Sequence, residues 1–64
     1  MKRLYYLVAR CGDTNYGMEL SESKIRCDYS ITDEDKEAIL RLDVNEIHYG
    51  TFTVGKPFAC KRLS

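Results

Sequence analysis

The residues with the most evident chemistry are one histidine, His48, and three cysteines, Cys11, Cys27 and Cys60. Together they match the composition of a Cys₃His zinc site. Structural zinc sites usually place ligands in pairs about two to four residues apart, so that one turn aims both at the metal. No such pair occurs here, so we expect no metal and no cofactor. The cysteines are interpreted as reduced core thiols, with one disulfide plus one free thiol as the alternative.

The same residues suggest a Cys–His nucleophile pair, if His48 meets Cys11 or Cys60 across a sheet and a third group orients it. A chain of 64 residues leaves little room for both a core and the concave pocket that substrates usually need. We therefore expect no enzyme. His48 is expected to face solvent or to bond to an acidic residue of a helix. The glycines are scattered along the chain, so no phosphate-binding loop is present.

Length and composition predict one small domain, residues 1–64, near the lower size limit for independent folding. Its stability is expected to be at most roughly 3–5 kcal/mol unless a partner, a metal or a disulfide adds to it, so docking onto a larger protein or a second copy is expected. Ten acidic and ten basic side chains give zero net charge and no general attraction to polyanions. With no membrane-spanning stretch and no convincing signal peptide, we expect a cytoplasmic protein.

The first half of the chain predicts three strands. Residues 2–11 are apolar on both alternating sets, which is typical of a strand buried on both faces. Turn formers at 12–15 lead into a one-sided strand from Tyr16 to Leu20, so these two strands should form a hairpin. Residues 21–24 are polar enough for a loop. The alternation from Ile25 to Tyr29 then predicts a short third strand.

A single helix is expected from Asp33 to about Leu42. Thr32 is a suitable N-cap, and the carboxylates of residues 33–35 suit the positive end of the helix dipole. The apolar stripe of this helix is narrow and includes Ile39.

Residues 46–63 predict a C-terminal hairpin that reverses at Gly55-Lys56-Pro57, and its return strand is expected to pair beside residues 2–11. Gly50 leaves two alternatives for the first strand. As a bulge it would bring Tyr49 and Phe52 onto one buried face, whereas a regular strand would separate them and leave one free for a partner. The predicted fold is α+β, with a small antiparallel sheet of four or five strands, the order β-β-β-α-β-β and one helix packed on one face.

Charge is segregated along the chain. Residues 1–10 carry three basic and no acidic side chains, residues 28–49 carry seven acidic and two basic ones, and residues 50–64 carry three basic and no acidic ones. One interpretation is a solvated surface whose helix acids complement the dipole. The other is a bipolar surface that binds a protein.

By elimination, we expect a small cytosolic regulator or inhibitor that occupies a surface of a larger protein. Its size is similar to that of bacteriophage and mobile-element proteins that block a host enzyme. Contact is expected through the acidic helix or through an exposed sheet edge, which could also pair with a second copy. The predicted protein-binding residues are Asp33, Glu34, Glu37, Arg41, Tyr49 and Thr53.

The alternative is a module that binds single-stranded nucleic acid, with basic terminal strands and tyrosines as a stacking platform. The RNP-type glycine and aromatic signature of RNA-binding sheets is absent. The residues predicted for this function are Lys2, Arg3, Tyr5, Arg10, Lys56, Lys61 and Arg62.

Overall fold

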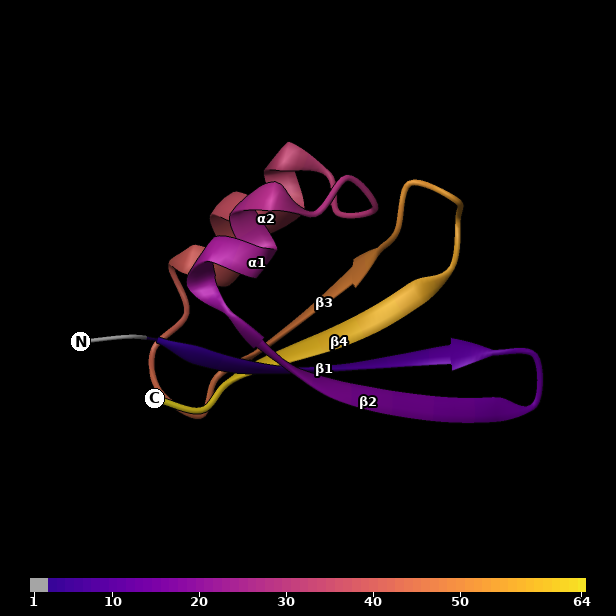
Figure 1. Ribbon diagram of the computed structural model, residues 1–64, viewed down its shortest axis with the longest axis horizontal. Coiled ribbons are helices and arrows are strands. Elements are labelled where there is room, and N and C mark those ends of the chain that lie inside the picture. Colours follow the sequence, from indigo (N-terminus) through magenta and orange to yellow (C-terminus); the bar gives the residue numbers. More distant parts are fainter. Residues whose placement is uncertain (1–2) are drawn as a thin grey trace.

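Four antiparallel strands and two helices form the fold, in which both helices cover the same face of the sheet (Figure 1). The structure is a computed structural model that describes residues 3–64, except for the side chain of Cys11. The strand order is β2-β1-β4-β3. The elements are β1 (Leu4–Cys11), β2 (Thr14–Ser21), α1 (Glu22–Cys27), α2 (Asp33–Leu40), β3 (Ile47–Thr51) and β4 (Pro57–Arg62).

The predicted hairpin between the first two strands is confirmed. β1 and β2 pair from Leu4 opposite Ser21 to Cys11 opposite Thr14, around a two-residue turn. Gly12 adopts a φ of 63° at the first position of that turn, which is where a type II′ turn requires a glycine. The tip of this hairpin extends past both helices (Figure 1).

The expected third strand is wrong, because residues 22–27 form helix α1. Ser21 caps this helix, with its Oγ accepting a hydrogen bond from the Lys24 N–H at 3.3 Å. Ile25 is fully buried in the core, whereas Cys27 and Tyr29, which share its alternating pattern, are exposed. So short a helix depends on tertiary packing, and the burial of Ile25 provides it.

The second helix begins where the sequence predicts and ends slightly earlier. Thr32 Oγ1 accepts a hydrogen bond from the Asp35 N–H at 3.2 Å, and the helix runs from Asp33 to Leu40. Ile39 is its one buried residue. Two helices therefore cover the sheet, where the sequence predicted one.

The C-terminal hairpin is confirmed, as is the pairing of its return strand with β1. Gly50 lies opposite Phe58 in an unbroken register, so it forms no bulge. Tyr49 and Phe52 consequently lie on opposite faces. Phe52 stacks on Phe58 with ring centroids 4.6 Å apart, while the Tyr49 side chain is 74% exposed.

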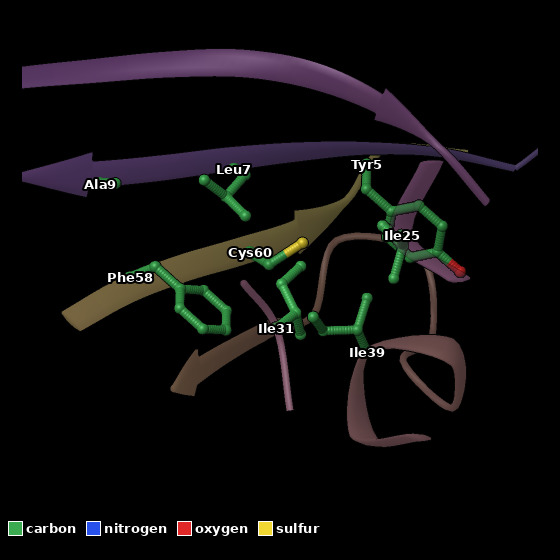
Figure 2. Close-up of a cluster of buried hydrophobic side chains, with 8 residues drawn as sticks. All are labelled: Tyr5, Leu7, Ala9, Ile25, Ile31, Ile39, Phe58 and Cys60. Carbon is green, nitrogen blue, oxygen red and sulfur yellow. The ribbon is translucent and has the colours of Figure 1, made fainter. Parts of the chain in front are cut away.

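The core lies between the sheet and the helices (Figure 2). Ile25 and Ile39 enter it from the two helices, and Ile31 enters it from the loop between them. The sheet supplies Tyr5, Leu7 and Ala9 from β1, and Phe58 and Cys60 from β4. The α+β class predicted from the sequence is confirmed.

Candidate functional site

His48, Cys60 and Asp35 lie together on the helix-covered face of the sheet. His48 and Cys60 are directly opposite each other on β3 and β4. The His48 Nε2 atom lies 2.9 Å from Oδ1 of Asp35, the third residue of α2. The order carboxylate, imidazole, thiol is that of a nucleophilic triad, and the histidine is bonded to a helix acid as one of the sequence alternatives predicts.

The thiol of this cluster is not activated. Cys60 is fully buried, and burial raises its pKa to about 11. At pH 7 only about one thiol in ten thousand is then ionised, whereas reactive cysteines have lowered pKa values and are partly exposed. The three residues therefore act as packing and hydrogen-bonding groups in this conformation.

Asp35 joins the start of α2 to strand β3. The hydrogen bond from His48 has the largest effect and lowers the pKa of the Asp35 carboxyl group. Burial opposes this effect, and bonds from the Thr32 side chain and the Thr51 N–H lower the pKa further. Asp35 and His48 are 18% and 23% exposed, so water screens this pair only partly. The pair fixes the helix on the sheet.

We predict that Asp35→Asn lowers the free energy of unfolding at pH 7 by about 1–3 kcal/mol, because it weakens bonds to a charged acceptor. The pKa of Asp35 is lowered from its ordinary value of 3.8, so its contribution is present above that pH and is lost as the pH falls through the lower folded value. Urea unfolding of both proteins between pH 7 and about pH 2 measures this. The control is Asp33→Asn, in the same helical turn. If the stability loss of Asp35→Asn persisted unchanged at pH 2, it would not come from the ionised carboxylate of Asp35.

The basic residues predicted to form a nucleic-acid platform are not gathered on one surface. Arg3 and Arg62 donate hydrogen bonds to the carbonyl oxygens of Leu40 and Leu42, both at 2.8 Å. These bonds hold the two arginines at the end of α2. Tyr5 is fully buried and cannot stack on a base.

The other four members of that set lie elsewhere or outside the described residues. Arg10 and Lys61 lie on the helix-free face of the sheet, on β1 and β4. Lys56 lies in the loop between β3 and β4. Lys2 lies outside the described residues.

The predicted protein-binding residues are also divided between the two sides of the sheet. Asp33, Glu34 and Glu37 are exposed on α2, with Arg41 just beyond its end. Tyr49 points away from the helices, so it shares no surface with these acids.

Thr53 was expected to make contact through an exposed sheet edge, but it lies outside the strands, so its expected place on an edge is wrong. β3 ends at Thr51, and the Thr53 N–H donates a hydrogen bond to the Ser30 carbonyl oxygen at 2.9 Å. This bond joins the segment after β3 to the loop between the helices. A proline at Thr53 would therefore break an internal bond and would not probe a free edge.

The helix-free face of the sheet carries several exposed large apolar side chains. Tyr6 and Val8 of β1 are 39% and 40% exposed there, and Ile47 of β3 is 46% exposed. With Tyr49 they lie in two neighbouring rows across the sheet, one running Tyr6, Lys61, Ile47 and the other Val8, Ala59, Tyr49. We call this surface the open face; it also includes Pro57, Arg10 and Glu19.

Sequence patterning missed most of the open face. Residues 2–11 are apolar on both sides, a pattern that predicts burial on both faces, but helices cover only one face. Tyr6 and Val8 were thus expected in a core. The signal for an interaction site is a strand with the apolar pattern of a buried strand but with one face exposed, because contiguous exposed apolar surface usually marks such a site.

A hollow of about 200 Å³ lies at one end of the open face, where Val8, Tyr49, Pro57 and Ala59 contribute to its lining. Its volume is below the roughly 300–1,000 Å³ of most small-molecule sites. A second hollow, of about 380 Å³, lies beside α1 and is lined by Leu20, Lys24, Cys27, Asp28, Tyr29 and Ser30. The open face is therefore better suited to a broad, flat contact than to an enclosed ligand.

No protein-family model, curated protein or solved structure matches this chain. Across residues 3–64, leaving aside the Cys11 side chain, no three His, Cys, Asp or Glu side chains converge as a metal site would require. No helix in the described part of the chain is long and apolar enough to cross a membrane.

Proposed function

We propose that this chain is a small cytoplasmic binding protein that acts without catalysis, as a regulator or inhibitor of a larger protein, and that the open face is its contact surface. The observation that carries the proposal is the exposure of Tyr6, Val8, Ile47 and Tyr49 on one face of the sheet, at 39–74%. A two-layer fold leaves this face without a covering layer. Tyrosine is enriched at protein interfaces because it combines a large apolar ring with a polar end.

The chemistry of the open face indicates the kind of partner. Lys61 lies between Tyr6 and Ile47, Arg10 lies beyond Val8 along β1, and Glu19 lies opposite Tyr6 on β2. A matching surface would present apolar side chains opposite the apolar residues and carboxylates opposite the two cations. The acidic outer side of α2 is then a solvated surface that complements the helix dipole and does not form the contact.

Tyr49→Asp is predicted to reduce capture of the partner at least tenfold, because it replaces the most exposed aromatic side chain of the open face with a charge. The measurement is affinity capture from the native host with quantitative mass spectrometry, followed by a binding titration of the recovered protein. The matched control is Tyr29→Asp, because Tyr29 is 95% exposed but lies in the loop between the two helices.

The same titration distinguishes the acidic helix from the open face. The double variant Glu34→Lys and Glu37→Lys reverses charge on α2 and leaves the open face intact. We expect it to bind normally. Loss of binding in this variant, with normal binding by Tyr49→Asp, would move the contact to the helix and overturn the proposal.

Binding of single-stranded nucleic acid is the second candidate, because Tyr6, Tyr49, Arg10 and Lys61 share one face. Exposed aromatic rings beside cations can stack successive bases. Titration of labelled single-stranded DNA and RNA at about 50 mM salt tests it, since such binding is strongest at low salt. An absence of binding under that condition would eliminate this candidate.

A further inference from the structure

The two edges of the sheet differ in how they are protected. On the β3 side, the Thr51 N–H donates to the Asp35 carboxylate and the Thr53 N–H donates to the Ser30 carbonyl oxygen. On the other side, β2 is an eight-residue edge strand whose residues from Thr14 to Glu19 are all exposed. It contains no proline and one charged residue, Glu19, so it lacks the usual devices that block edge pairing.

The turn between β1 and β2 determines which residues of β2 hydrogen-bond to β1 and which direct their backbone groups outward. In a two-residue hairpin the closing pair, here Cys11 and Thr14, exchanges both backbone bonds, and such pairs recur at every second residue. Tyr16 and Met18 therefore bond to β1. Asn15, Gly17 and Glu19 direct their backbone N–H and C=O groups away from it, toward any added strand.

We propose that β2 pairs antiparallel with β2 of a second copy of this chain, about a two-fold axis at Gly17. A two-fold axis perpendicular to the sheet leaves each side chain on the same face in both copies. A residue can therefore pair only with itself or with a residue an even number of positions away in the second copy. The axis at Gly17 places Tyr16 opposite Met18 of the second copy, twice. These are non-hydrogen-bonded pairs, whose side chains approach closely, and sulfur–aromatic contacts are favourable.

Exposure and charge both favour this register. Tyr16 and Met18 are 43% and 44% exposed, and they lie opposite Ala9 and Leu7 on the side of the sheet that the helices occupy. On the open face, Asn15 would face Glu19 of the second copy, and Arg10 would lie two strand spacings, about 10 Å, from that carboxylate-bearing residue. An axis at Glu19 would instead place two carboxylates opposite each other.

The inference does not rest on the proposed function, because it concerns the purified chain alone. Analytical ultracentrifugation of the wild-type protein across a concentration series is expected to show a monomer–dimer equilibrium. Met18→Lys is expected to weaken dimerisation at least tenfold, and so is Glu19→Pro, which removes an outward N–H but no bond to β1. Val54→Lys is the matched control, because Val54 is 74% exposed in the β3–β4 loop.

Disulfide trapping tests directly whether Tyr16 lies opposite Met18 of the second copy. With Cys11 and Cys27 changed to serine, a mixture of Tyr16→Cys and Met18→Cys proteins is expected to form a cross-linked heterodimer at least tenfold faster than either protein alone. A wild-type protein that stays monomeric up to about 1 mM overturns the proposal. A dimer that survives both Met18→Lys and Glu19→Pro, or that traps no heterodimer, overturns it equally. Circular dichroism confirms that each variant is folded before it is compared.

Discussion

Replacing Ile39 with alanine is expected to leave a large fraction of the chain unfolded at 25 °C. Ile39 is fully buried and is the one buried residue of α2, so its side chain holds that helix on the sheet. Truncation of a buried isoleucine to alanine costs about 2–5 kcal/mol. A domain of this size has roughly 3–5 kcal/mol in total, so the loss is comparable to its whole stability. Urea unfolding followed by circular dichroism measures the change.

The control for Ile39→Ala is Val44→Ala, because Val44 is 50% exposed beyond the end of α2. It is expected to change the free energy of unfolding by less than about 0.5 kcal/mol. If Ile39→Ala cost no more than this control, α2 would not depend on the buried contact seen here.

Gly50→Ala is expected to lower the free energy of unfolding by about 1–3 kcal/mol through overpacking, and Gly50→Val by more. A Cβ atom at this position would lie 2.7 Å from Cζ of Phe58 and 2.9 Å from Cγ of Asp35. Neither neighbour moves freely, since Phe58 stacks on Phe52 and Asp35 is bonded to His48. Urea unfolding at pH 7 gives the magnitude.

Gly17→Ala is the matched comparison on β2. A Cβ atom there would lie 2.3 Å from the Tyr6 hydroxyl oxygen, which is a closer approach than any at Gly50. Tyr6 is 39% exposed, so its ring can swing toward solvent, and we expect a loss below about 1 kcal/mol. Equal losses at the two glycines would show that the rigidity of the neighbours is not what matters.

Helix α1 shows where periodicity stops being informative. Ile25, Cys27 and Tyr29 alternate as in a strand, yet Ile25 and Tyr29 are also four residues apart, as on one face of a helix. In so short a run the two patterns cannot be separated. The Ser21 cap was a local signal for the helix, but the burial of Ile25 against the sheet is what makes six residues helical.

The exposed residues of the open face were even harder to predict from the sequence than helix α1. The sequence named Tyr49 as one of two aromatic residues that a regular strand would separate, and this holds because β3 and β4 pair without a bulge at Gly50. Tyr6, Val8 and Ile47 were not predicted to be exposed, because their apolar pattern is equally that of a buried strand. Only the absence of a covering layer on that side distinguishes the two cases.

The features that the sequence determined are those whose causes are local. Gly12 and Gly55 specify the turns, Thr32 specifies the start of α2, and the acidic first turn follows the helix dipole. The tertiary structure alone decided which face of β1 the helices cover, that His48 meets Asp35 beside Cys60, and that β2 is left as an exposed edge. Each of these arises from packing between residues far apart in the chain, and such contacts leave little trace in the neighbouring sequence.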